Sequence, residues 1–189
     1  MKERNPYDYY QTPINELEHF LEELSKVDTT ILPSIKKILD PCAGGDSTIG
    51  QLMPYPLCLR KILPNAEIDT NDIREESYSK IKSDYLSSDF KTGKYDMIIT
   101  NPPFNLALEI MSKAIDDVGE NGYVVMLVRV SFLGSQRRKT FWDTNMPKYI
   151  FYHHKRMSFV PGGKTDNSEY MHVVFQKGYK ENYSKIYVI

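Results

Sequence analysis

Residues 95–104 read YDMIITNPPF, an apolar run that ends in an asparagine, two prolines and a phenylalanine. The run predicts a buried parallel strand. Because Pro102 and Pro103 cannot continue a hydrogen-bonded ladder, the chain must leave the sheet abruptly and in an extended conformation. This exit presents the Asn101 amide, two proline carbonyls and the Phe104 ring at the carboxyl edge of a sheet. The amide oxygen and a proline carbonyl can accept both protons of a planar amine, while the aromatic ring stacks on the ring that bears it.

A second motif, ILDPCAGGD, occupies residues 38–46. Here an apolar strand runs into Gly44 and Gly45, which permit positive φ angles and a close approach of a ligand to the backbone. The pattern favours a strand, a ligand-binding loop and a helix that begins near Ser47 or Thr48. The GxGxxG pattern of dinucleotide-binding folds is absent from this motif, so a nicotinamide cofactor is not expected.

Strand-like and helix-like segments alternate around these motifs, which is typical of an open α/β sheet. The first helix is predicted from apolar residues at helical spacing, namely Leu17, Phe20, Leu21 and Leu24. The expected strands are 35–40, 66–70, 84–86, 95–100, 122–130, 149–152 and 170–176. The expected helices are 15–24, 47–53 with a break at 54–56, 75–81, 104–118 and 135–142. Residues 157–169 are expected to form the one long loop late in the chain.

The two motifs together resemble those of the amino-methyltransferases, which use S-adenosylmethionine (SAM) to methylate adenine N6, cytosine N4 or glutamine amides. Asp40-Pro41 followed by Ala43-Gly44 is most similar to the first motif of the small adenine-N6 DNA methyltransferases of phages and bacteria. The resemblance covers most of the chain. It implies an α/β, Rossmann-like class I methyltransferase fold, with a seven-stranded, mostly parallel sheet and helices on both faces.

The resemblance also implies where the cofactor binds, because ligands of open α/β sheets bind where the strands end. The positions expected to bind SAM are Thr12, Asp40, Pro41, Ala43, Gly44, Asp72, Ile73 and Asp84. The loop after the first strand would cradle the methionine part. Asp72 would accept the ribose hydroxyls, with Ile73 against the adenine ring, and Asp84 would accept from the adenine amine.

Three of these assignments have alternatives in the sequence. Asp69 competes with Asp72 for the ribose, and Asp89 competes with Asp84 for the cofactor adenine. Thr12 either belongs to a segment that closes over the SAM carboxylate or caps the helix that follows it.

The resemblance makes Asn101, Pro102, Pro103 and Phe104 the catalytic residues. The amine of adenine is a poor nucleophile because its lone pair is delocalised into the ring. Hydrogen bonds from its protons to Asn101 and Pro102 would draw the nitrogen toward sp3 character and aim the lone pair at the SAM methyl group. The reaction is then a direct displacement in which positioning supplies much of the rate, and no cysteine nucleophile is required.

Substrate contacts are expected from the late loop. Phe159 and Lys164 would grip a flipped nucleotide there, and a plain connector is the alternative. The basic stretches Arg137-Arg138-Lys139 and Lys155-Arg156 predict either phosphate contacts or a solvated face. The neighbouring pair His153-His154 has too few companions at ligand spacing, so no metal is expected.

Length and composition set the remaining expectations. A chain of 189 residues, 41% hydrophobic, supports a single domain over 1–189, with residues 1–34 as an N-terminal cap and helix and no separate target-recognition domain. The formal net charge of −1 excludes a global basic field, so any contact with a polyanion must be local. Two cysteines in unlike contexts predict reduced thiols. No apolar run is long enough for a membrane span and no signal peptide is recognisable, so a cytoplasmic protein without membrane contact is expected.

The expected function is therefore methyl transfer from SAM to the N6 amine of adenine in DNA. Nucleic acid is the expected partner, with DNA favoured over RNA, and a homodimer or a separate recognition partner stays open. RNA adenine-N6 methylation is the alternative among enzymes. A SAM-fold module that has lost catalysis and works inside a larger complex is the alternative from another class.

Overall fold

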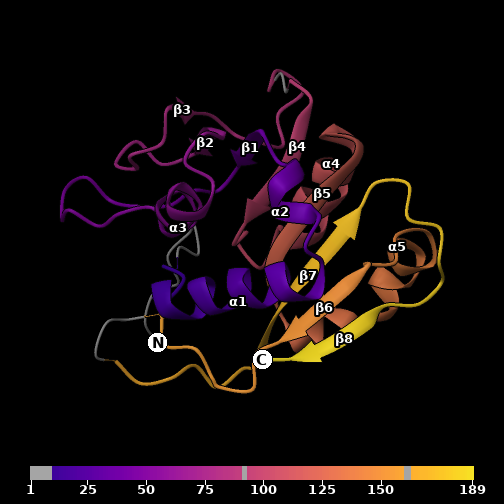
Figure 1. The fold of residues 1–189 in the computed structure, drawn as a ribbon. Coiled ribbons are helices and arrows are strands. Elements are labelled where there is room, and N and C mark those ends of the chain that lie inside the picture. The colour runs from indigo at the N-terminus through magenta and orange to yellow at the C-terminus, as the bar shows by residue number, and fades with distance from the viewer. Residues whose placement is uncertain (1–9, 91–92, 160–162) are drawn as a thin grey trace.

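The computed structural model describes residues 10–90, 93–159 and 163–189, and within these residues eight strands form one sheet (Figure 1). The strands are β1 (Lys37–Asp40), β2 (Glu67–Asp72), β3 (Ile81–Lys82), β4 (Tyr95–Thr100), β5 (Val118–Arg129), β6 (Tyr149–Tyr152), β7 (Tyr170–Gln176) and β8 (Lys185–Val188). The α-helices are α1 (Ile14–Val27), α2 (Ile31–Ser34), α3 (Pro54–Ile62), α4 (Ala107–Asp117) and α5 (Lys139–Thr144). Two 3-10 turns, Val130–Leu133 and Gln136–Arg138, join β5 to α5.

The strand order is β3-β2-β1-β4-β5-β7-β6-β8. Pairing is parallel throughout except at β7, which runs antiparallel to both β5 and β6. The order reverses beside β1, since β2 lies on one side of it and β4 on the other. The carboxyl ends of these three strands therefore open onto a common crevice, the usual ligand position in such sheets.

Helices cover both faces of the sheet, as the sequence predicted. Leu17, Phe20, Leu21 and Leu24 of α1 are all buried and share one core cluster with Met97 and Ile99 of β4. The intervening Ile98 points to the opposite face, where it packs with α4 through Ile110, Met111 and Ala114. Both faces of β4 are thus buried, which explains why its sequence is continuously apolar.

Several expected elements are confirmed, and three are wrong. Strands β4, β6 and β7 have the predicted bounds, and α1 extends the predicted 15–24 by a few residues. The helix expected at 47–53 is absent: Asp46 and Gln51 pair in a bridge, and the helix begins at Pro54 instead. A proline at the first helical position lacks only an N–H that would be unpaired anyway, so 54–56 starts a helix where a break was expected.

The segment between β2 and β4 also differs from the prediction. Residues 75–81 form bends instead of a helix, and the third strand is Ile81–Lys82 instead of 84–86. Asp84 starts a turn in which its Oδ1 accepts from the Leu86 N–H at 2.9 Å, and this turn competes with strand pairing. Strand β8, an eighth strand beside β6, was not expected. None of the helices described is both long and apolar enough to cross a membrane.

Candidate functional site

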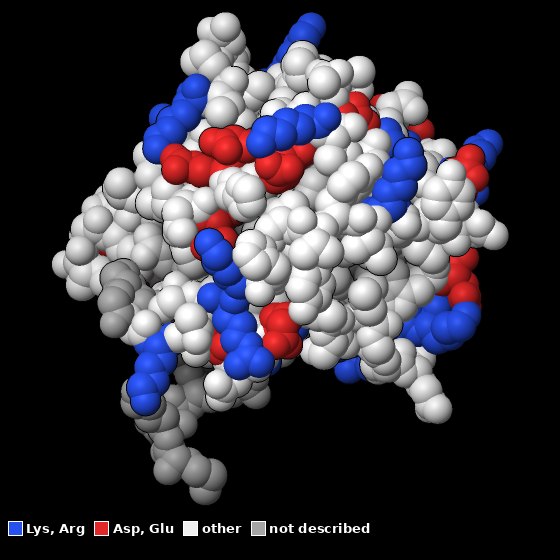
Figure 2. All heavy atoms as spheres, turned by 60° about the horizontal axis from the view of Figure 1, so that its bottom comes forward, with Lys and Arg blue, Asp and Glu red and all other residues white. Residues whose placement is uncertain are grey.

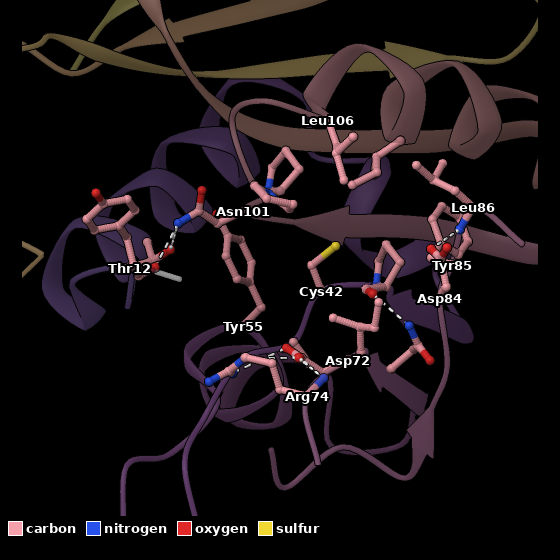
Figure 3. A pocket seen from close by; sticks show the side chains of 18 of the residues that line it. Thr12, Cys42, Tyr55, Asp72, Arg74, Asp84, Tyr85, Leu86, Asn101 and Leu106 are labelled. Atoms are coloured by element: carbon pink, nitrogen blue, oxygen red, sulfur yellow. Dashed lines mark hydrogen bonds and ion pairs between the residues drawn. The ribbon is translucent and has the colours of Figure 1, made fainter. Parts of the chain in front are cut away.

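A pocket with a volume of about 370 Å³ lies at the carboxyl ends of β1, β2 and β4 (Figure 3). Its walls come from the segment before α1, the loop after β1, the end of β2, the turn at 83–86 and the NPPF segment after β4. Of the predicted site residues, Thr12, Pro41, Ala43, Asp72, Ile73, Asp84, Asn101, Pro102 and Pro103 line this pocket. The other five predicted site residues do not line it, namely Asp40, Gly44, Phe104, Phe159 and Lys164.

The nitrogen of the Asn101 side-chain amide is hydrogen-bonded, and its oxygen has no partner among the described residues. Its Nδ2 donates to the backbone carbonyl of Tyr10 at 3.0 Å and to Oγ1 of Thr12 at 3.1 Å. Its Oδ1 is buried and has no hydrogen-bond partner among the described residues. An amide oxygen that is buried without a donor is costly. Because Asn101 lines the pocket, a ligand that reaches this oxygen could supply the missing donor.

Thr12 contributes to the pocket and does not cap α1. The residue before the helix is Pro13, which makes no side-chain cap, and Thr12 is almost fully buried against Asn101. The capping alternative for Thr12 is therefore wrong.

The glycine loop after β1 has the backbone conformation that the sequence predicted. Gly44 and Gly45 have φ angles of 69° and 76°, where other residues are strained. A Cβ on Gly45 would also come within 3.0 Å of the Gln51 carbonyl oxygen and the Met53 side chain. The loop is tied to β2, because the Ala43 N–H donates to the Asn71 carbonyl at 2.8 Å.

Asp72 connects this loop to the end of β2. Its Oδ2 accepts from the Gly44 N–H at 2.8 Å, and its Oδ1 accepts from the backbone N–H and Nε of Arg74 at 2.9 and 3.1 Å. Arg74 is equally buried and also donates to the Gly45 carbonyl at 2.9 Å. The sequence offered no signal for this buried ion pair, which holds the carboxylate at the pocket wall (Figure 3).

The alternative carboxylates lie elsewhere. Asp69 accepts from the Tyr95 hydroxyl at 3.0 Å, and neither Asp69 nor Asp89 lines the pocket, whereas Asp84 does. Asp96 accepts from the backbone N–H groups of residues 36 and 37 at 2.8 and 2.9 Å, which is a structural role at the start of β1.

Burial shapes the protonation of the groups around the glycine loop. Asp40 is fully buried, and this burial raises its pKa to about 7. Burial also raises the pKa of the Cys42 thiol well above its usual value and that of Cys58 to about 11. Both thiols stay protonated at neutral pH, and a protonated thiol is a poor nucleophile.

Phe104 lies in an aromatic cluster beside the pocket. Its ring stacks near-parallel to that of Tyr10, with centroids 6.1 Å apart, and lies 5.7 Å from the ring of Tyr170. The Phe159 ring joins the cluster, 5.8 Å from Tyr10 and 4.9 Å from Tyr170. The predicted catalytic residue Phe104 and the predicted substrate residue Phe159 therefore lie in one aromatic cluster, although they are distant in sequence.

A smaller hollow of about 210 Å³ adjoins this cluster and is lined by Phe104, Asn105, Arg129, Ser131, Phe132 and Arg138. The Arg129 guanidinium lies over the Phe104 ring, 4.7 Å from its centroid. Lys164 is exposed and lies apart from both hollows. Residues 160–162 of its predicted loop lie outside the described residues. Among the described residues no group of three or more His, Cys, Asp or Glu side chains is arranged to hold a metal ion.

Sequence reasoning missed Tyr55, Arg74 and Arg129 as neighbours of the site. Tyr55 lies between Pro54 and Pro56, where the sequence predicted a break after a helix. Its ring lines the pocket and points toward Asn101 (Figure 3). Tyr10 is brought to Asn101 only by folding, across 91 positions.

Comparisons with known proteins identify the fold. No family model matches the sequence, and no curated protein matches it. Among solved structures, a Listeria monocytogenes protein assigned to the class I SAM-dependent methyltransferases aligns with 100% of this chain and 68% of its own, at 12% identity and a TM-score of 0.65. A protein of Pyrococcus horikoshii assigned as an RNA methyltransferase aligns over 92% and 90% of the two chains, at 14% identity and a TM-score of 0.61.

The M protein of the type I restriction enzyme EcoKI is a third similar structure. It covers 87% of this chain and 47% of its own, at 15% identity and a TM-score of 0.61. The chain thus has the Rossmann-like class I methyltransferase fold, with an additional strand, β8, at the edge of the sheet.

Proposed function

We propose that this protein transfers a methyl group from SAM to the N6 amine of adenine in DNA. One observation carries the proposal: Oδ1 of Asn101 is buried without a partner among the described residues, directly after β4 ends at Thr100 and directly before Pro102 and Pro103. An amide oxygen and a proline carbonyl side by side can accept both protons of an exocyclic amine. The fold supports the class of reaction, since the similar structures include SAM-dependent methyltransferases.

The pocket offers SAM a place for each of its parts. The backbone of the glycine loop would hold the methionine part, with Thr12 on the opposite wall. Asp72 would accept from the ribose hydroxyls, sharing its oxygens with Arg74, and the half-exposed Ile73 would cover the adenine ring. Asp84, exposed at the pocket wall, would accept from the amine of that ring.

The residues around Asn101 then perform the transfer by positioning. Accepting the amine protons at Oδ1 and at the Pro102 carbonyl localises the nitrogen lone pair and directs it at the methyl group. The new N–C bond forms as the S–C bond breaks, and the amine loses a proton afterward. Neutral Asn101 orients the amine without competing for its proton as a base.

The chemistry beside the pocket supports a nucleotide as the acceptor. The ring of Tyr10 is exposed at the pocket wall, and a flipped base could stack there against the aromatic cluster that contains Phe104 and Phe159. Arg138 and Arg129 line the adjoining hollow, where a phosphate can bind. On the face shown in Figure 2, acidic and basic side chains of the described residues are interspersed, so this face offers no broad basic surface for a polyanion. We therefore place the phosphate contact locally, at the hollow that Arg129 and Arg138 line.

Labelled methyl transfer tests the proposal and separates its alternatives. Incubation with tritiated SAM and separate DNA and RNA pools, followed by digestion to nucleosides, should yield N6-methyladenine from DNA. The same product from RNA alone would replace DNA by RNA as the substrate. SAM binding by calorimetry with no transfer to either pool would support a non-catalytic module, and no SAM binding by folded protein would refute the proposal altogether.

Replacing Phe104 tests base stacking. Stacking on an aromatic side chain is worth on the order of 1–3 kcal/mol, so Phe104→Ala should lower kcat/KM roughly ten- to a hundred-fold. Phe104→Tyr keeps the ring face and should retain near-normal kcat/KM. Because Phe104 also packs against Tyr170, thermal unfolding of both variants must confirm that they are folded. Equal kcat/KM values for the two variants would contradict the stacking role.

Arg138 and Arg137 form a matched pair for testing the phosphate contact. Arg138 lines the hollow, and its Nη1 also donates to the Phe132 and Gly134 carbonyls at 3.1 and 2.9 Å, so thermal unfolding must confirm that its variant is folded. Arg137 instead forms an ion pair with Glu109 at 3.0 Å. Arg138→Ala should raise the substrate KM and reduce the salt slope of binding by about one counterion, as for the loss of one phosphate contact. Arg137→Ala should change neither beyond about twofold, in keeping with the small contribution of exposed ion pairs. A larger effect of Arg137→Ala than of Arg138→Ala on KM and on the salt slope would assign the phosphate contact to Arg137, which does not line the hollow.

A further inference from the structure

Asn71 joins two parts of the pocket wall through its side chain. It lies near the end of β2, is 1% exposed and lines the pocket. Its Nδ2 donates to the backbone carbonyl of Pro41 at 2.9 Å and to that of Ser83 at 3.0 Å. Pro41 directly follows β1, and Ser83 directly follows β3 and precedes Asp84. One NH2 group therefore connects the segments that leave the two neighbours of β2 in the sheet.

The two partners fix the orientation of this amide. Both are backbone carbonyls, which only accept, so the NH2 group and not the oxygen must face them. The Asn71 Oδ1 is buried and has no hydrogen-bond partner among the described residues, and a buried oxygen without a donor costs free energy. The side chain therefore stabilises the pocket wall through its two donors.

The glycine loop has other bonds to β2. The Ala43 N–H donates to the backbone carbonyl of Asn71 at 2.8 Å, and the Gly44 N–H donates to Oδ2 of Asp72 at 2.8 Å. Neither bond involves the Asn71 side chain. The loop is therefore held in place independently, and the Asn71 NH2 group can hold the segment at Ser83 against it.

The segment at Ser83 is less firmly attached to the sheet. Strand β3, which leads into it, is two residues long, and both residues are exposed. The Ser83 N–H donates to the Asp72 carbonyl at 3.2 Å, a longer bond than the one from Asn71 to the Ser83 carbonyl. Asp84 comes next, exposed, at the end of the pocket away from Asn101 (Figure 3). The position of Asp84 thus depends on how Ser83 is held.

We propose that Asn71 is a positioning residue, which holds Asp84 where its carboxylate accepts from the amine of the SAM adenine and so sets the preference of the pocket for that base. The inference rests on the proposed function, in which SAM occupies this pocket and Asp84 accepts from that amine. Without the Asn71 NH2 group, the segment at Ser83 can shift relative to the glycine loop. Asp84 would then have to be ordered when the ligand binds, and this ordering lowers affinity.

Discrimination between two ligands tests this role. Calorimetry compares S-adenosylhomocysteine (SAH), the demethylated product of SAM, with its deamino analogue, in which a hydrogen atom replaces the N6 amine. Wild-type protein should bind SAH about tenfold more tightly, because the analogue offers Asp84 no donor. In Asn71→Ala this preference should fall to about twofold or less. A merely structural role would weaken both ligands by the same factor, and an unchanged preference in Asn71→Ala would overturn the inference.

Lys177→Ala is the matched control. The Lys177 Nζ also donates to two backbone carbonyls, those of Asp116 and Val118 at 2.8 and 2.9 Å, but Lys177 does not line the pocket. Its preference for SAH should equal that of the wild type. Asn71→Leu is a second variant, which keeps the branching of the side chain without a donor and should lose the preference as Asn71→Ala does. Thermal unfolding must confirm that all three variants are folded.

A measurement on the wild-type protein needs no substitution. In nitrogen-15 NMR, the side-chain NH2 protons of Asn71 should exchange with solvent more slowly than those of the exposed Asn182. Equally fast exchange at both residues would contradict the two bonds and overturn the inference.

The ligand measurements also separate this inference from the proposed function. Wild-type protein that binds neither SAH nor the analogue would refute the proposed function, and the exchange of the Asn71 NH2 protons would still test the two bonds. Equal binding of both ligands by the wild type would overturn the Asp84 contact and this inference with it, and would leave SAM binding in place.

Discussion

Asn101→Ala should lower kcat for methyl transfer by about 10²–10³-fold, the usual cost of removing one well-placed hydrogen-bonding group that acts on the transition state. The reason is that Oδ1 of Asn101 is buried and unpartnered among the described residues, so the target amine is the group available to occupy it. Single-turnover kinetics with labelled SAM measure the effect. Calorimetry should show a SAM affinity within a few-fold of the wild type, because Asn101 faces the acceptor amine and not mainly the cofactor.

The control for this prediction is Asn145→Ala. Asn145 ends α5 and donates to the Phe141 carbonyl at 3.1 Å, and it does not line the pocket. Its loss should leave kcat unchanged. Near-normal turnover in Asn101→Ala would refute the mechanism, and a parallel loss of SAM affinity would instead assign Asn101 to the cofactor.

Asp72→Asn should weaken SAM binding by about a hundred-fold, equivalent to roughly 2.7 kcal/mol. The substitution leaves the buried Arg74 without its counter-charge, which is a costly change in the interior. It also sets an NH2 group against either the Gly44 N–H or the Arg74 side chain, both of which are donors. The glycine loop then loses its link to β2 on the wall where SAM would bind. Calorimetry with SAM measures the loss, and thermal unfolding should show a lower Tm.

Asp69→Asn separates this prediction from the sequence alternative. Asp69 lies three residues earlier on the same strand, bonds the Tyr95 hydroxyl and does not line the pocket. SAM affinity should stay within a few-fold of the wild type in this variant. Weaker binding in Asp69→Asn than in Asp72→Asn would assign the ribose to Asp69 and contradict the site described above.

The parts of the fold that depend on local pattern could be predicted from the sequence. The continuous apolar run before Asn101 fixed β4 to the residue, and the helical spacing of Leu17, Phe20, Leu21 and Leu24 fixed the buried face of α1. The glycine pair after β1 predicted positive φ, since glycine alone adopts it without strain. Such features are readable because each is set by residues close together in the chain.

Local pattern failed where short elements depend on their neighbours. The region 47–56 contained both a plausible helix start and two prolines, and the choice between them was made by the bridge of Asp46 with Gln51 and by the burial of Tyr55. Strand β3 is two residues long, and pairing with β2, not its own composition, places it. Strand β8 likewise exists through its pairing with β6.

The contacts within the candidate site, by contrast, could be read only from the folded protein. Asp72 and Asp84 line the pocket, whereas the alternatives Asp69 and Asp89 do not. The amide of Asn101 was oriented by Tyr10 and Thr12, about 90 positions away in the chain. Hydrogen bonds of this kind join residues whose proximity depends on the whole sheet and its covering helices, so no spacing within the sequence can specify them.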